Sequence, residues 1–348
     1  MSAARASAGR PGAGRRRLIW RIALLGVTAA SLYLLLPSLV EVFSSWPALR
    51  DLNPWWFALM AGTQAASLAC VWTLQRAMLR TRGWFAVATS QLAGNAFGRV
   101  VPGGGATAAA LQVGMLARSG VPSAQAVSAL TTAQAVGFAT LAALPVVSLL
   151  TFAGSTPIDR GLLAAAWIGA IAFVVLFAVG AVLLITERPL VWLGAVIQAA
   201  INRLRRHREL SGLPQRLAQE RQRVAQALAA RWPEALAASV GRWAFDYATL
   251  LAALWAVDAD PDPSLVLLAF TLSALLSMIP LTPGGLGFVE AGLTGTLALA
   301  GVAGGDAVVA ALAYRLFSYW LHLPAGPVAY WLFGRRYGRR GGAEPARG

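Results

Sequence analysis

The chain has 348 residues, of which 57% are hydrophobic and only 12% are charged, and its mean hydropathy is +0.62. This composition excludes an ordinary soluble domain and predicts an all-α, polytopic membrane protein, because roughly 20 apolar residues cross a hydrocarbon core about 30 Å thick. The formal net charge of +15 is compatible with nucleic-acid binding. The arginines flank apolar segments, however, so we assign them to the cytoplasmic bias of basic residues and expect no nucleic-acid partner.

The first 17 residues are small, Gly-rich and Arg-rich, and we expect a disordered basic cytoplasmic tail. The apolar run 18–40 that follows is too long for a signal peptide and lacks a clear cleavage site, so a retained first span is expected. Beyond it we predict a single transmembrane domain over 18–335 and a cytoplasmic tail over 336–348. The spans, in order, are 18–40, 54–79, a broken pair 84–117, 124–152, 161–185, 234–257, a second broken pair 264–303, and 306–333.

Arginine placement predicts the orientation. Arginine clusters alternate with loops that carry acidic residues, and a consistent assignment puts both termini in the cytoplasm of a multi-pass plasma-membrane protein. The polar segment 187–233 then lies on the cytoplasmic side. Its later part has helical spacing of apolar residues among arginines, which suits either anionic headgroups or a solvated connector. A soluble partner could bind at 187–231.

The two broken pairs share a pattern. Val-Pro-Gly-Gly-Gly at 101–105 is followed by Gly120-Val121, and Thr-Pro-Gly-Gly-Leu at 282–286 is followed by Gly301-Val302, each 181 positions later. Proline and glycine interrupt helices, and interrupted backbone at membrane depth must be covered by protein or line a cavity. Units 54–152 and 234–333 therefore predict an inverted repeat with two broken or re-entrant helix pairs, a hallmark of transporters.

Glu290 is the acid most indicative of a functional site, because a carboxylate at membrane depth is costly. Arg315, inside the last predicted span, is its expected partner. The sequence leaves two alternatives open: a structural ion pair without ligand, or an arginine that binds a lipid phosphate. His322 shares part of that helix and is expected to pack rather than relay protons.

In the first repeat, Gln91, Asn95 and Arg99 recur every four residues and so share one helical face that leads to the break. We expect Arg99 to contact a headgroup. Arg242 and Asp246 form another i, i+4 pair and are expected to satisfy one another. The candidate lipid-binding or translocation residues are Asn95, Arg99, Pro102, Gly103, Gly104, Pro283, Gly284, Gly285, Glu290 and Arg315.

The sequence offers no catalytic constellation. The two histidines are isolated, the Asp-rich loop 258–262 lacks calcium-loop spacing, and the Gly-rich breaks lack the Lys-Ser/Thr of a nucleotide-binding loop. We therefore expect no metal, no cofactor and no enzymatic activity.

The motifs resemble those of the lysylphosphatidylglycerol synthase transmembrane region, a family of flippase-like integral membrane proteins. The resemblance rests on Asn95 with Pro-Gly-Gly-Gly at 102–105, and more strongly on PLTPGGLG at 280–287 with Glu290 and Tyr314-Arg315. It implies movement of a lipid between leaflets or handling of lipid-linked sugars. The chain departs from the pattern after the first Pro-Gly, where many members have an acid and an arginine. We also expect no soluble aminoacyl-transferase domain after the short Arg-rich tail.

We therefore predict translocation of an anionic or phosphate-bearing lipid, either a phospholipid or a polyprenyl-phosphate-linked lipid. The main alternative is a membrane-embedded subunit or enzyme of glycolipid or lipid-modification synthesis, whose cavity holds a lipid acceptor. A third possibility is a scaffold that recruits a soluble transferase through 187–231. The sequence indicates no oligomeric state.

Overall fold

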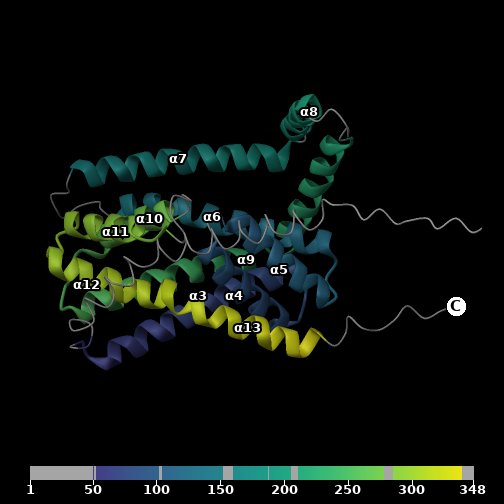
Figure 1. Ribbon diagram of the computed structural model, residues 1–348. Coiled ribbons are helices and arrows are strands. Elements are labelled where there is room, and N and C mark those ends of the chain that lie inside the picture. The colour runs from purple at the N-terminus through teal and green to yellow at the C-terminus, as the bar shows by residue number, and fades with distance from the viewer. Residues whose placement is uncertain are drawn as a thin grey trace, which may run out of the picture.

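The computed structural model describes residues 50, 52–101, 104–151, 160–186, 188–204, 211–277 and 285–338. Within these ranges every regular element is a helix, which confirms the predicted all-α bundle (Figure 1). The predicted tail 1–17 and span 18–40 lie outside the described residues, as does most of the predicted tail 336–348. Four candidate site residues also lie outside them: Pro102, Gly103, Pro283 and Gly284.

The first half contains α3 (Pro54–Leu79), α4 (Trp84–Val100), α5 (Gly105–Arg118) and α6 (Ser123–Thr151). α3 begins where its sequence predicts, because Asn53 accepts a hydrogen bond from the Trp55 amide and Pro54 occupies the first turn. By length and composition, two helices among the described residues are able to cross a membrane: α3 and residues 123–150 of α6.

Helices α4 and α5 form a hairpin. Their 17 and 14 residues give lengths of about 26 and 21 Å at 1.5 Å per residue, less than the hydrocarbon thickness. They pack closely, since a Cβ added at Gly98 would stand 2.8 Å from the Cβ of Ala108. The predicted break therefore produces two short helices that fold back on each other.

The middle of the chain contains α7 (Arg160–Ile185), α8 (Arg188–Leu204) and α9 (Leu213–Ala256). α9 is bent where Arg231 leaves helical geometry, two residues before Pro233. Its second part is the predicted span 234–257. The polar segment 187–233 thus holds α8 and the first arm of α9, which descends from α8 before the bend (Figure 1).

The second half contains α10 (Pro263–Leu276), α11 (Phe288–Leu299), α12 (Gly304–Arg315), the π-helix η2 (Leu316–Trp320) and α13 (His322–Tyr337). α10 and α11 form the second hairpin, with lengths of about 21 and 18 Å. The predicted span 306–333 falls on α12, η2 and α13, where a π-helical turn changes the regular α-helical hydrogen bonding and Leu321 N–H donates to the Leu316 carbonyl.

The two hairpins end in the same way. Gly120 and Gly301 both have positive φ, at 101° and 92°. The next residue closes the same hydrogen bond in both halves: Val121 N–H donates to Leu116 O, and Val302 N–H to Leu297 O, each at 3.1 Å. This is a Schellman cap, in which glycine adopts the left-handed conformation at low cost. The spacing noticed in the sequence is therefore a repeated structural unit.

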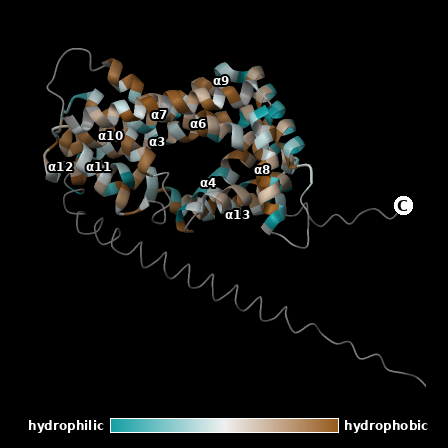
Figure 2. Ribbon diagram, turned by 90° about the horizontal axis from the view of Figure 1, so that it is seen from above, coloured by the Kyte–Doolittle hydropathy of each residue, from teal (hydrophilic) through white to brown (hydrophobic). Residues whose placement is uncertain are grey.

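The halves pack against each other through α3 and α9, which run antiparallel. Thr63 bonds Thr249 and Ser67 bonds the carbonyl of Arg242, so rising numbers on one helix meet falling numbers on the other. Each hairpin also packs on the final helix of the opposite half, α4 on α13 and α10 on α6. In both views α10 and α11 lie toward one end of the bundle, while α4 lies nearer its middle (Figures 1 and 2).

Candidate functional site: a cavity between the two hairpins

A cavity of about 1020 Å³ lies between the tips of the two hairpins. Its wall is drawn from both halves of the chain, including α3, α4, α5, α6 and α9 and the interrupted helix α12–η2–α13. The lining combines arginines with neutral amides. The charged members are Arg99, Arg242, Asp246 and Arg315, and the amides are Gln64, Gln75, Gln91, Asn95, Gln112 and Gln134.

Arg99 joins the tip of the first hairpin to the π-helix. Its Nε donates to Asn95 Oδ1 at 3.1 Å, and its Nη1 donates to the carbonyls of Ser318 and Tyr319 at 2.9 and 2.8 Å. A π-helical turn leaves carbonyls available because its hydrogen bonds span five residues instead of four. Arg99 was expected to contact a headgroup, but three of its donor contacts are made within the protein.

Glu290 and Arg315 form a buried ion pair. Arg315 Nε lies 2.7 Å from Glu290 Oε1, and both side chains are only 7% exposed. Glu290 occupies the first turn of α11 and Arg315 the last turn of α12, where each charge complements its helix dipole. The predicted pairing is confirmed. Arg315 also lines the cavity, so the pair joins the second hairpin to the cavity wall.

The ring of Tyr319 lies against both Arg99 and Arg315. The guanidinium carbons of Arg99 and Arg315 lie 4.9 and 4.6 Å from the centre of its ring, and the side chain is buried. Two cations on one aromatic ring are each favoured by its π electrons. Both hairpin tips therefore meet within the five residues Arg315–Tyr319 of the interrupted helix.

The predicted mutual satisfaction of Arg242 and Asp246 is wrong. No ion pair joins them in the described part of the chain. Arg242 lies over the ring of Trp243 at 4.2 Å, while Asp246 Oδ1 accepts from the Tyr314 hydroxyl at 3.3 Å. Both residues line the cavity, and neither was among the candidate site residues. Their i, i+4 spacing inside an apolar span was the available signal.

The amides cross-link the cavity wall. Gln112 Nε2 donates to Gln75 Oε1 at 2.8 Å, and the Trp72 indole donates to Gln91 Oε1 at 3.2 Å. Neutral amides can satisfy one another and still present donors and acceptors to a polar ligand. The cavity thus offers hydrogen-bonding partners to a polar group.

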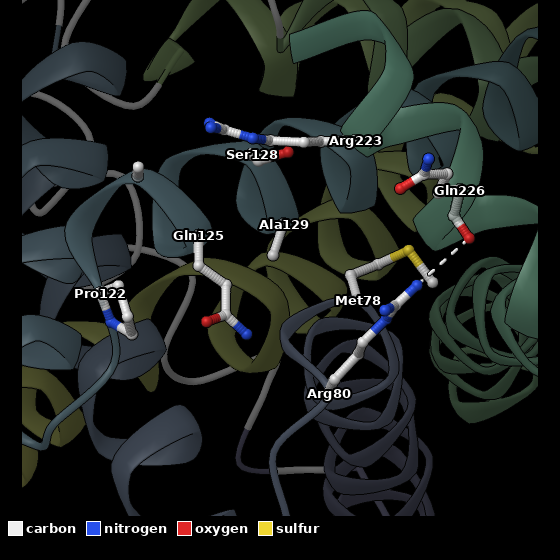
Figure 3. A pocket seen from close by; sticks show the side chains of 9 residues that line it. Met78, Arg80, Pro122, Gln125, Ser128, Ala129, Arg223 and Gln226 are labelled. Carbon is white, nitrogen blue, oxygen red and sulfur yellow. Dashed lines mark hydrogen bonds between the residues drawn. The ribbon is translucent and has the colours of Figure 1, made fainter. Parts of the chain in front are cut away.

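A second, smaller pocket of about 370 Å³ lies where α3 ends, α6 begins and the first arm of α9 passes (Figure 3). Arg80 and Arg223 approach it from two different elements, and Arg80 Nη2 donates to the carbonyl of Gln226 at 3.3 Å. Gln125 donates to the carbonyl of Leu79 at 2.8 Å. The first contact joins the first arm of α9 to the end of α3, and the second joins α6 to α3.

The structure brings most of the described candidate residues together. Asn95, Arg99, Gly104, Gly285 and Arg315 line the cavity, and Glu290 supports it through Arg315. Sequence reasoning missed the two residues of α9 and the π-helical carbonyls. The latter have no proline or glycine signal in Leu316–Trp320.

The family model described as Lysylphosphatidylglycerol synthase TM region matches residues 18–326. The chain belongs to this family. The resemblance stated from the motifs is thereby confirmed, and the family is one of membrane proteins. A "UPF0104 membrane protein" of Methanothermobacter thermautotrophicus is 31% identical over 98 residues, which cover 28% of each chain. No solved structure matches the chain.

Proposed function

We propose that this protein moves an anionic or phosphate-bearing lipid between the two leaflets of a membrane. One observation carries the proposal: an arginine- and amide-lined cavity lies between the tips of two hairpins from opposite halves of a repeat. Short, broken helices that meet at a central site are the arrangement by which inverted repeats bind a substrate and expose it alternately to two sides.

The cavity chemistry supports this substrate class. Arginine matches phosphate and carboxylate groups through paired hydrogen bonds, and several amides around it can accompany a polar headgroup. The acyl chains would remain in the surrounding lipid. We further propose a multi-pass location in the plasma membrane, with the arginine-rich end facing the cytoplasm.

Lipid scrambling in proteoliposomes tests the proposal. Purified protein is reconstituted with headgroup-labelled phospholipid, and an impermeant quencher is added from outside. Protein-free vesicles retain about half of the signal because the inner leaflet is protected; a translocating protein exposes it to the quencher. Glu290→Gln, which removes the charge that pairs with Arg315, should slow this exposure.

Protection equal to that in empty vesicles, with correctly folded protein and both phospholipid and polyprenyl-phosphate probes, would refute translocation. The remaining proposal would then be a membrane-embedded subunit or enzyme of glycolipid or lipid-modification synthesis. The same cavity would hold its lipid acceptor, and the reconstituted protein would be assayed for acceptor binding.

A further inference from the structure

Arg242 differs from the other two arginines of the cavity. Arg99 donates to three protein acceptors and Arg315 is paired with Glu290. The guanidinium of Arg242 makes no hydrogen bond or ion pair with any residue that the structure describes, although it lines the cavity. This planar group therefore keeps hydrogen-bond donors without a described protein acceptor at the cavity wall.

The position of Arg242 is well defined despite this lack of hydrogen bonds. Its guanidinium lies on the Trp243 ring, and the Trp243 indole is itself fixed by a 2.9 Å hydrogen bond to the carbonyl of Gly137 on α6. The backbone of Arg242 is held by Ser67 of α3 at 3.0 Å. A Cβ at position 137 would stand 3.1 Å from Arg242 Nη1, so glycine leaves the space that the guanidinium occupies.

Charge in the cavity favours an anion at this place. Glu290, behind the wall, neutralises Arg315, and the described lining then holds two other arginines, Arg99 and Arg242, against one acid, Asp246. Asp246 is one helical turn from Arg242 but bonds Tyr314 instead. Arg242 is half-buried in the cavity wall and has no direct ion-pair partner among the described residues, so an anion bound in the cavity would gain a charge-assisted contact there.

We propose that Arg242 binds the anionic group, phosphate or carboxylate, of the cavity's ligand, while Arg99 and Arg315 hold the hairpin tips in place. This rests on the proposed function and names the residue that selects its substrate. Lipids whose headgroups carry an anion bind through paired hydrogen bonds to the guanidinium. Lipids with uncharged sugar headgroups gain nothing from it.

The test compares two fluorescent lipids in the scrambling assay: phosphatidylglycerol and a glucosyl diacylglycerol, which has no anionic group. Arg242→Gln should slow phosphatidylglycerol by about tenfold or more, as loss of hydrogen bonds to a charged group implies. The same variant should change the scrambling rate of the glycolipid by no more than about twofold relative to the wild type. Gly137→Ala, which keeps the charge but crowds the guanidinium, should slow phosphatidylglycerol by a smaller factor.

Arg335→Gln is the matched control, because Arg335 lies over the Trp331 ring near the end of α13 and outside the cavity lining. It should change neither rate. Equal slowing of both lipids by Arg242→Gln would show a structural role and overturn the proposal, as would unchanged rates for both.

Binding is measured separately, so that failure of transport and failure of this inference can be told apart. Short-chain phosphatidylglycerol should raise the unfolding temperature of the detergent-solubilised wild type, and the shift should be lost in Arg242→Gln even if no lipid is scrambled. An equal shift in both proteins would overturn the inference. If inorganic phosphate produced an equal shift, the claim that the bound anion belongs to a lipid would be overturned, and the site would be assigned to a free anion.

Discussion

Glu290 and Arg315 form a buried ion pair that joins the second hairpin to the interrupted final helix. Removing either partner leaves an uncompensated buried charge, which costs about 3–5 kcal/mol. We therefore expect Glu290→Leu and Arg315→Met each to lower the stability of the detergent-purified protein by that amount. The double variant should lose much less than the sum, as chemical unfolding curves will show. Additive losses of stability would mean that the two residues have no measurable interaction energy.

Arg99 should keep the first hairpin tip against the π-helix. Arg99→Gln removes the donors to the Ser318 and Tyr319 carbonyls, so the tip should separate more often. In a Cys70→Ser background, a cysteine at Ser318 should then react several-fold faster with a small impermeant thiol reagent. Arg82→Gln, at an exposed position before α4, is the control. An unchanged rate would show that Arg99 does not hold the tip.

Gly326 sets the distance between α13 and α4. A Cβ there would collide with the Cβ of Ala96, so Gly326→Ala should cost about 1–3 kcal/mol through overpacking. Adding Ala96→Gly should recover most of the loss. Gly334→Ala lies on the same helix with nothing within 4 Å and should be neutral or slightly stabilising. Thermal unfolding distinguishes the three variants, and equal effects at 326 and 334 would contradict this packing.

Gly301 adopts positive φ in the cap of α11. Gly301→Ala should cost about 1–2 kcal/mol, because an L side chain is strained in the left-handed conformation. Gly295→Ala, inside the same helix and with nothing within 4 Å of the added Cβ, should stabilise it instead. Hydrogen exchange of the α11 amides measures both changes. Similar protection in the two variants would argue against a Schellman cap.

Asp262 caps α10 outside the predicted spans. Hydrogen bonds from the Ser264 hydroxyl and amide lower the pKa of its carboxyl below the ordinary value. The ionised carboxylate therefore stabilises the fold fully at pH values above the ordinary pKa of aspartate. This stabilisation is lost as the pH falls through the lowered pKa of the folded protein. Asp262→Ala should cost about 1 kcal/mol at neutral pH, while Asp262→Asn, still a good cap, should remove the pH dependence. Asp260→Ala in the same loop is the control, and unfolding temperatures against pH supply the measurement.

The parts of the fold that depend on local chemistry could be predicted from sequence. Asn53-Pro54 begins α3, and Gly120 and Gly301 end their hairpins, because capping depends on neighbouring residues. The Arg242–Asp246 prediction was wrong for the opposite reason. Spacing showed that the two side chains can meet, but Trp243 and Gly137, the latter far away in sequence, decide where the guanidinium lies. The contact of Arg99 with the π-helical carbonyls of Ser318 and Tyr319 is likewise long-range, and no local pattern reveals it.

The exchange of hairpins between the halves has a consequence for biosynthesis. α4 belongs to the first half yet packs mainly on α13, which follows every other described helix in the sequence, and α10 returns to α6. The ribosome therefore releases α4 and α5 long before their permanent neighbour exists. During that interval the translocon, a chaperone or surrounding lipid must shelter the first hairpin, so its packing is completed only after α13 has been made.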